Sequence, residues 1–266
     1  MNKLDLIEKT LITAQAAFNE AKKDKRFKES QSRGYGGDVT MFFDDYVERT
    51  IVQELKNYVG TILTEEKGII DGHGKGIAII DPVDGSTNTA RDLPFCASTI
   101  AIANGNEFKD VVAAGTIDLI RGELFLCDGE RVLLNGKEVK TSNTKDLNDV
   151  IASIDVKLTK ENLKFVNRLN KILESVRYIR FLGAIALDTA YVAAGRLDAF
   201  IAPTPRVRFL DLVGGLFMIK VAGGYVEVMG EEIDRMKLLD NKRIAVLGIN
   251  NIELAKKIKA IMLEND

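Results

Sequence analysis

The chain has 266 residues, of which 46% are hydrophobic and 29% charged, so it can bury a sizeable core and is neither disordered nor collagen-like. Its 37 basic and 39 acidic residues give a formal charge of −2, which disfavours nucleic-acid binding. The longest uncharged stretch, 93–106, is too short to span a bilayer, and the charged N-terminus differs from a signal peptide. With two cysteines and one histidine, the composition predicts a cytoplasmic protein without a disulfide framework or a multi-histidine zinc site.

Apolar periodicity divides the first half of the chain into helices and strands. Spacings of three and four predict an opening helix over 4–18 and a second helix over 44–58. The glycine-rich segment between them, 32–37, is expected to form a flexible loop. Apolar runs then predict strands at 61–64, 76–80, 98–103 and 111–117.

A polar connector at 141–149 is expected to separate two lobes, 1–145 and 146–266. Beyond the connector, the pattern predicts strands at 150–156, near Tyr178, at 198–201, at Tyr225 and at Ala245. It predicts helices at 160–174, 184–195 and 211–221, and a final helix from Ile252.

An AsnGly pair at 135–136 predicts a hairpin turn, with antiparallel edge strands at 123–126 and 139–140. Hairpins in the first half, together with mixed strands and helices in the second, predict layered α and β structure. The fold class is therefore expected to be α+β rather than a simple doubly wound sheet.

The most informative feature is AspProValAspGlySerThrAsn, at 81–88, directly after a predicted buried strand. Pro82 is expected to end that strand, and Gly85 to permit a tight turn. The turn can point the carboxylates of Asp81 and Asp84 to one side, beside free N–H groups at the positive end of a helix dipole. The plainer interpretation, acids that only cap a helix and fill a turn, suits an isolated AspPro or AspGly pair better than the whole string.

Carboxylates beside an anion site would repel a phosphate, each by about 4 kcal/mol at 4 Å if the effective dielectric is about 20. Divalent cations remove this conflict. Oxygen ligands without His or Cys favour Mg²⁺, and two ions about 4 Å apart can hold both the attacking and the leaving oxygen of an in-line displacement.

The motif at 81–88 resembles the signature of the inositol monophosphatase superfamily, the lithium-sensitive Mg²⁺-dependent phosphatases. Three further segments match the family in unbroken order, within a similarity that covers about 35–230: the loop and helix start at 37–44, ThrGluGlu at 64–66 and LeuAspLeuValGlyGly at 210–215. The segment 196–201 is most similar to the archaeal and bacterial branch with dual fructose-1,6-bisphosphatase and inositol monophosphatase activity. The resemblance implies an αβαβα sandwich with mixed, largely antiparallel sheets, and a homodimer.

The resemblance also implies a role for each matching residue, with two to three Mg²⁺ ions per active site. The implied metal ligands are Glu65, Asp81, the carbonyl of Val83, Asp84 and Asp211. The implied phosphate-binding amides are those of Gly85 and Ser86. The implied catalytic residues are Asp44, Glu65 and Ser86, of which Asp44 and the Ser86 hydroxyl would orient the attacking water.

Several of these residues also have plainer interpretations. Asp211 could serve only as the N-cap of the helix that it opens. Glu65 and Glu66 could be solvated loop acids. Asp45 lies four residues before Arg49, which favours a surface ion pair and leaves Asp44 as the functional choice. GlyHisGlyLysGly, at 72–76, lacks the spacing of a nucleotide-binding loop and predicts a turn.

The sugar end of the pocket is expected at Gly183 and Ala184, at a helix start. Arg206 and Arg208 are available to a second phosphate or to sugar oxygens, although ordinary surface positions suit them equally. Animal inositol monophosphatases carry an acidic residue where this chain has Thr204, so selectivity for inositol is not implied.

The sequence thus predicts a Mg²⁺-dependent phosphomonoesterase acting on a small sugar or polyol phosphate, with fructose 1,6-bisphosphate and inositol 1-phosphate both as candidates. We expect neither a nucleic acid nor a membrane as partner. Two alternatives remain: a 3′-phosphoadenosine 5′-phosphate nucleotidase of the same superfamily, and a non-catalytic relative that binds RNA or protein.

Overall fold

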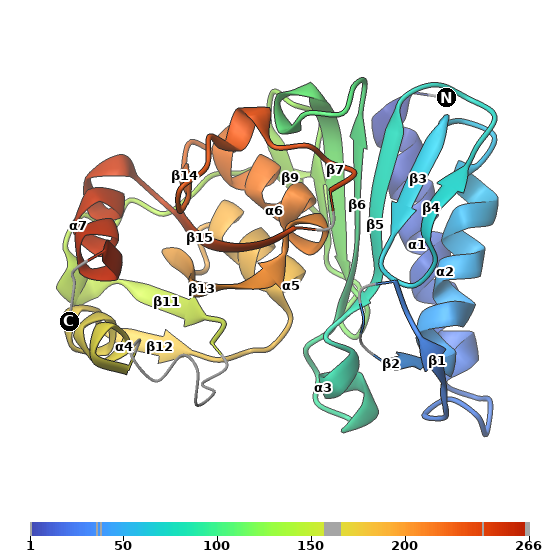
Figure 1. Cartoon of the computed structure of the whole chain (residues 1–266), viewed down its shortest axis with the longest axis horizontal. Coiled ribbons are helices and arrows are strands. Elements are labelled where there is room, and N and C mark those ends of the chain that lie inside the picture. The colour runs from blue at the N-terminus through green and yellow to red at the C-terminus, as the bar shows by residue number, and fades with distance from the viewer. Residues whose placement is uncertain (1, 36, 38, 157–165, 241, 264–266) are drawn as a thin grey trace.

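The computed structural model describes residues 2–35, 37, 39–156, 166–240 and 242–263. Within these ranges, helices and two large sheets stack as five layers, in the order helix, sheet, helix, sheet, helix (Figure 1). Each large sheet mixes parallel and antiparallel pairs. The expected αβαβα sandwich of class α+β is confirmed.

The first layer consists of two helices that cover one face of the larger sheet. Helix α1 (Lys3–Ala21) is capped by the Asn2 side chain, which accepts from the backbone N–H of Asp5 at 2.8 Å. Helix α2 (Phe42–Leu55) begins two residues before the predicted start and ends three before the predicted end. Both helices bury an apolar stripe against the sheet.

Between these helices the expected loop at 32–37 is partly wrong. Strand β1 (Ser30–Arg33) pairs with β2 (Val39–Met41) as a small antiparallel sheet. The pairing satisfies backbone groups of a segment with little apolar periodicity, which is why the sequence pattern predicted a loop.

The larger sheet has eight strands in the order β10-β9-β8-β7-β6-β5-β3-β4. Its strands are β3 (Thr61–Thr64), β4 (Gly68–Asp71), β5 (Ile77–Asp84), β6 (Ala97–Ala103), β7 (Val111–Asp118), β8 (Leu124–Cys127), β9 (Val132–Leu134) and β10 (Lys137–Val139). The AsnGly turn joins β9 to β10. The segments 123–126 and 139–140 are therefore not the two strands of one hairpin. Strand β8 is instead antiparallel to β7 and to β9. Strands β4 and β9 were not predicted.

Strand β5 lies inside this sheet and is buried along its whole length. Ile77 and Ile79 belong to the core between the two large sheets, whereas Ala78 and Ile80 face α1 and α2. The expectation that Pro82 ends the strand is wrong, because β5 continues to Asp84 with a register shift between Asp81 and Asp84. A proline lacks the N–H that a regular ladder needs, and an irregular pairing accommodates it.

The second half of the chain forms a five-stranded sheet in the order β12-β11-β13-β15-β14. Its strands are β11 (Ile151–Ile154), β12 (Tyr178–Arg180), β13 (Ala199–Arg208), β14 (Tyr225–Val228) and β15 (Arg243–Ile249). Helices α5 (Ile185–Ala193) and α6 (Phe209–Val221) fill the layer between the two large sheets. Strand β13 runs seven residues beyond the predicted end at 201, which brings it to the start of α6.

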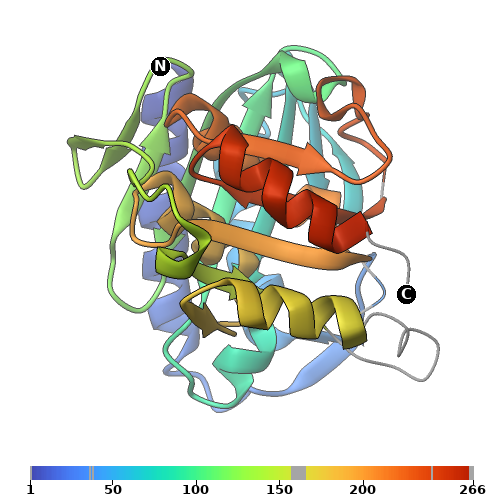
Figure 2. The same ribbon diagram turned by 90° about the vertical axis from the view of Figure 1, so that its left-hand side faces the viewer.

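Helices α4 (Val166–Ser175) and α7 (Ile252–Leu263) cover the outer face of the five-stranded sheet (Figure 2). The predicted start of α4, at 160, lies outside the described residues. The large sheets divide between β10 and β11, around the connector at 141–149, but the expectation of two lobes stays a prediction. Among the described helices, none combines the length and apolar character needed to cross a bilayer.

Candidate active site

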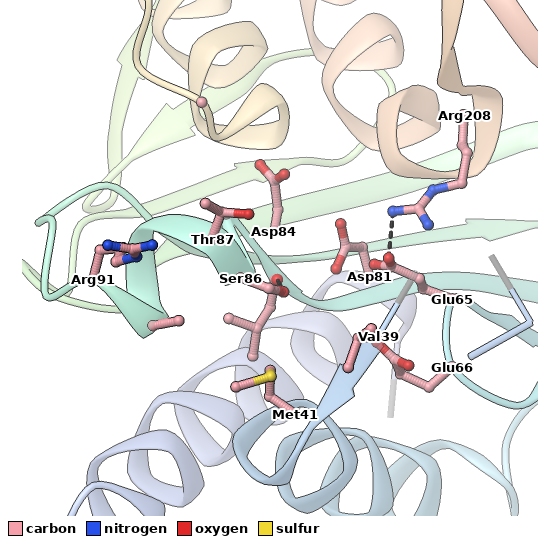
Figure 3. Close-up of a pocket in the computed structure, with 14 residues that line it drawn as sticks. Val39, Met41, Glu65, Glu66, Asp81, Asp84, Ser86, Thr87, Arg91 and Arg208 are labelled. Carbon is pink, nitrogen blue, oxygen red and sulfur yellow. Dashed lines mark hydrogen bonds and ion pairs between the residues drawn. The ribbon is translucent and has the colours of Figure 1, made fainter. Parts of the chain in front are cut away.

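A cavity of about 440 Å³ opens where β5 ends and α3 (Ser86–Ala90) begins. Its lining residues come from the β1–β2 hairpin, the turn after β3, the end of β5, α3, the loop before α5 and the end of β13 (Figure 3). They are Val39, Met41, Glu65, Glu66, Asp81, Val83, Asp84, Gly85, Ser86, Thr87, Ala90, Arg91, Gly183 and Arg208. The cavity therefore joins the two halves of the chain.

Three buried acids from distant parts of the sequence meet beside this cavity. Glu65 follows β3, Asp81 lies in β5, and Asp211 is in the first turn of α6. Each offers a carboxylate oxygen, and these oxygens all lie within 4.8 Å of one another. Asp211 is not the N-cap of α6, which is Arg208, so the plainer interpretation of Asp211 is wrong.

The irregularity in β5 explains how two acids three residues apart face the same cavity. In a regular strand, Asp81 and Asp84 would point to opposite faces of the sheet. Here Asp81 is opposite Thr99 and Asp84 is opposite Ala97, so β5 carries one extra residue between them. Such a bulge brings both side chains to one side. Asp84 also accepts from the backbone N–H of Ala186 at 2.6 Å, which ties β5 to α5.

Burial and mutual repulsion raise the pKa values of these acids. Desolvation, followed by repulsion from Glu65, raises the pKa of Asp81 well above its usual range. Desolvation and Asp211 have the same effect on the pKa of Asp84. The pKa of Asp211 rises to about 7, because burial outweighs the lowering by Arg208. Keeping these carboxylates ionised in the buried cluster therefore costs free energy, because they repel one another. A bound cation would reduce this cost.

Two atoms of the cluster test whether it fits a metal ion. Asp81 Oδ1 and Asp211 Oδ1 are buried and have no hydrogen-bond partner among the described residues. An unsatisfied buried carboxylate oxygen is costly unless a cation or a donor reaches it. Clustered oxygen ligands without nitrogen or sulfur suit a hard divalent cation such as Mg²⁺. The donor set therefore fits the ions implied by the sequence.

Arg208 lies among these acids rather than in the open part of the cavity. Its Nε donates to Asp211 Oδ2 at 2.8 Å, and its Nη2 pairs with Glu65 Oε1. Burial alone would lower the pKa of the guanidinium, but Asp211 and Glu65 raise it above its usual range. The substrate contact expected for Arg208 stays a prediction, while its two carboxylate contacts are part of the structure.

Asp44 and Ser86 meet at the start of α3, where Ser86 lines the cavity and Asp44 contacts it without lining the cavity. Ser86 Oγ lies 3.0 Å from Asp44 Oδ1 and 2.9 Å from the carbonyl oxygen of Val83, and it can donate to either. Asp44 Oδ2 accepts from the backbone N–H of Met41 at 2.9 Å. Burial, and then repulsion from Glu66, raises the pKa of Asp44 well above its usual range. Asp44 is therefore a candidate proton acceptor in contact with a hydroxyl at the cavity.

The predicted anion site lies at the start of α3. Gly85 has a φ of 87°, and a Cβ at this position would lie 2.6 Å from the carbonyl oxygen of Phe95, so no larger residue fits. Helix α3 has only five residues, so its dipole attracts an anion less strongly than the sequence analysis expects. The N–H groups of the first turn lack partners within the helix, and anion binding by those of Gly85 and Ser86 stays a prediction.

The predicted sugar-side residues divide into two groups. Gly183 lines the cavity, and its carbonyl accepts from Asn88 Nδ2 at 3.2 Å. Ala184 is fully buried, Arg206 is half-buried, and neither lines the cavity. Thr204 is buried at 2% exposure. The structure therefore brings Gly183 and Arg208 to the cavity, but not Ala184 and Arg206.

Sequence reasoning missed Glu48, which is fully buried one helical turn after Asp44 on α2. Glu48 Oε2 accepts from the backbone N–H of Glu66 at 3.2 Å and from the Thr64 hydroxyl, while Oε1 pairs with Lys67 at 2.9 Å. Glu48 thus fixes the turn that carries Glu65. The four-residue spacing from Asp44 was the available signal. The cavity residues Arg91 and Met41 carried no such signal.

The chain is similar to known proteins along most of its length. The model of the inositol monophosphatase family matches residues 3–263. A fructose-1,6-bisphosphatase of Pyrococcus furiosus is 30% identical over 264 residues, which cover 97% of this chain and 96% of the relative. A Nus factor SuhB of Xylella fastidiosa is 31% identical over 241 residues, covering 87% and 82%. The crystal structure of the extragenic suppressor protein suhB from Bartonella henselae has the same fold, with a TM-score of 0.83 at 24% identity and 98% coverage of both chains.

Proposed function

The chain belongs to the inositol monophosphatase family and is a phosphoric monoester hydrolase; from this premise we propose that it is a Mg²⁺-dependent phosphatase of small sugar or polyol phosphates. The single observation that supports this most strongly is the buried cluster of Glu65, Asp81 and Asp211, whose oxygens lie within 4.8 Å of one another beside an open cavity. Two unsatisfied carboxylate oxygens in the cluster support a cation there.

In this proposal, two to three Mg²⁺ ions are held by Glu65, Asp81, the Val83 carbonyl, Asp84 and Asp211. Bound Mg²⁺ would offset the charge of the carboxylates and lower the pKa of water toward neutrality. That chemistry needs no histidine, and His73, the single histidine of the chain, is exposed in a turn.

The residues at the start of α3, together with Asp44, would bind the phosphate and orient the attacking water. The backbone N–H groups of Gly85 and Ser86 would bind the phosphate oxygens. Ser86 Oγ, 3.0 Å from Asp44 Oδ1, would accept a hydrogen bond from the attacking water and pass the proton to that carboxylate. The raised pKa of Asp44 makes it a stronger base than an exposed aspartate. Glu65, on the other side of the cavity, would complete the catalytic set.

The substrate class rests on the shape of the cavity and on the relatives. About 440 Å³ accommodates a phosphorylated sugar or polyol. The relative from Pyrococcus furiosus is named a fructose-1,6-bisphosphatase, which makes fructose 1,6-bisphosphate the first substrate to test, with inositol 1-phosphate as the second. Buried Thr204 replaces the acid that contacts inositol in animal enzymes, so strong selectivity for inositol is not proposed.

A second candidate function is regulatory. The relative from Xylella fastidiosa is named a Nus factor, and its 31% identity matches that of the named phosphatase. The charge of −2 and the intact acid cluster favour hydrolysis over nucleic-acid binding. The nucleotidase alternative has no observation in its favour. The homodimer and the cytoplasmic location stay predictions.

The deciding experiment measures phosphate release from fructose 1,6-bisphosphate, inositol 1-phosphate and 3′-phosphoadenosine 5′-phosphate, with Mg²⁺, with EDTA and with lithium. We expect turnover of a sugar or polyol phosphate that needs Mg²⁺, and a loss of about 10³-fold or more in Asp84→Asn. Asp45→Asn is the matched control, because Asp45 pairs with Arg49 at 2.7 Å on the surface of α2. Undiminished release in EDTA would contradict the proposal, as would RNA binding by a protein that releases no phosphate.

A further inference from the structure

Arg208 lines the cavity and contacts two of the three acids of the buried cluster. Its side chain is only 11% exposed, and Figure 3 shows the guanidinium directed toward Glu65 and Asp81. Nε donates to Asp211 Oδ2 at 2.8 Å, and Nη2 pairs with Glu65 Oε1. One guanidinium therefore bridges two proposed metal ligands, Glu65 and Asp211, that lie in different halves of the chain.

The bridge leaves a definite set of oxygens for other partners. Arg208 engages one oxygen of Asp211, and the other, Oδ1, is buried without a hydrogen-bond partner among the described residues. Asp81 Oδ1, in the same cluster, is also unpartnered. The guanidinium thus engages some of the carboxylate oxygens of the cluster and leaves Asp81 Oδ1 and Asp211 Oδ1 for another partner.

Charge explains why the bridge forms. Three carboxylates within 4.8 Å of one another in a buried site repel strongly unless a cation lies among them. Arg208 is a cation of the chain itself in direct contact with two of the three. A planar guanidinium, with its fork of donors, suits this role better than a lysine ammonium.

We infer that Arg208 is the built-in counter-cation of the metal site: it neutralises and holds Glu65 and Asp211 when no ion is bound, and it opposes ions that bind there. The inference rests on the proposed function, since it takes the acid cluster to be a Mg²⁺ site. It assigns Arg208 to ion binding, acting through the ligands as a positioning residue, rather than to the substrate.

Thermodynamic linkage turns this assignment into two coupled effects. Suppose that a contact stabilises the metal-free protein more than the metal-bound protein. It then weakens metal binding by the difference between these two stabilisation free energies. Removal of Arg208 should therefore destabilise the metal-free protein and tighten Mg²⁺ binding. A unit charge about 5 Å from a divalent ion changes the affinity on the order of tenfold, even at the dielectric constant of water. A purely structural role would lower stability without tightening binding.

The test compares the wild type with Arg208→Met and Arg208→Lys by titration calorimetry with Mg²⁺ and by melting in EDTA and in saturating Mg²⁺. We expect Arg208→Met to melt at a lower temperature in EDTA and to bind Mg²⁺ on the order of tenfold more tightly. Arg208→Lys, which keeps the charge without the fork, should fall between. The matched control is Arg196→Met, because Arg196 also donates two hydrogen bonds, at 2.6 Å each, to the carboxylate of Glu123 away from the cavity. It should alter melting equally in EDTA and in Mg²⁺ and leave the Mg²⁺ affinity unchanged.

The outcomes separate the inference from the proposed function. Mg²⁺ binding and turnover by the wild type, with unchanged or weaker Mg²⁺ binding in Arg208→Met, would overturn the role of Arg208 alone. A substrate KM that rises in Arg208→Met, without a change in Mg²⁺ affinity, would assign the residue to the substrate instead. Absence of Mg²⁺ binding by the wild type would overturn both.

Discussion

Two sets of buried carboxylates in this protein have opposite surroundings. The cavity acids are Glu65, Asp81, Asp84 and Asp211. The second set, named the loop acids because they accept from the backbone next to strand ends, consists of Asp118, the last residue of β7, and Asp198, just before β13; neither lines the cavity. Asp118 is fully buried and accepts from two backbone N–H groups and from Arg121 Nε, all within 2.9 Å. Asp198 accepts from the backbone N–H of Ile151 at 2.7 Å and from the Ser142 hydroxyl.

The two sets differ in the hydrogen-bond donors that surround their carboxylates. The loop acids meet donors of the chain itself, so their burial fixes turns and adds to stability. The cavity acids repel one another, and two of their oxygens have no donor within the described chain. A folded protein keeps such a costly arrangement where a ligand completes it. Burial alone therefore does not distinguish an acid that holds the backbone from one that is a candidate metal ligand.

The largest expected effect separates the two sets by activity. Asp81→Asn should reduce phosphate release by about 10³-fold or more, because it removes a proposed shared metal ligand. The free energy of unfolding in EDTA should not fall, because one repelling charge has gone. Steady-state kinetics and urea titration in EDTA measure the two effects. A marked loss of stability in EDTA would place Asp81 with the loop acids.

The converse substitution should act on stability. Asp118→Ala removes a fully buried acceptor from the backbone N–H groups of Ile120 and Arg121 and from Arg121 Nε, and it should lower the free energy of unfolding by about 3 kcal/mol. Urea titration measures this loss. The Mg²⁺ affinity and the turnover of the folded fraction should stay at wild-type values, since Asp118 lies outside the cavity. A change in Mg²⁺ affinity would show that the two sets are coupled.

The third prediction concerns pH. The pKa of Asp211 is about 7 in the folded protein, against about 4 for an exposed aspartate, so between these values the folded state holds more protons than the unfolded state. The stability of the metal-free protein should therefore fall as pH rises from 5.5 to 8, by a few degrees of melting temperature. Saturating Mg²⁺ should reverse the trend, because ions compete with protons for the same oxygens. Asp211→Asn should make both profiles less steep, leaving the part that Asp81 and Asp84 contribute through their own raised pKa values.

The smallest effect is expected at the surface. Arg49→Met removes the 2.7 Å pair with Asp45 on α2, where the Arg49 side chain is 55% exposed. Solvent screening should limit the loss to a few tenths of a kcal/mol. Urea titration at low and high salt measures it. A loss above 1 kcal/mol would mean that Asp45, which also pairs with Lys67, contributes to the turn that carries Glu65.

The sequence predicted much of the cluster, because the motif at 81–88 is a local strand-turn-helix unit. The αβαβα order was implied by resemblance and is confirmed. The bulge in β5 was not predicted, since register depends on pairing with β6. The extension of β13 was missed because Pro203 and Pro205 argue against a strand; they lie where its pairing with β15 is irregular. The bridge made by Arg208 was equally inaccessible, because it depends on how α6 packs against the turn after β3.

Asn88 shows how closely the two halves of the chain depend on each other. From α3 its amide reaches back to the carbonyl of Phe95 at 2.9 Å and across to the carbonyl of Leu182 at 2.7 Å, in the segment that leads into α5. One side chain thus connects the turn at the start of α3 to the second half of the chain. Neither half can be exchanged for that of a distant relative without rebuilding this junction, so chimeras of the family should keep Asn88 and its acceptors as a single module.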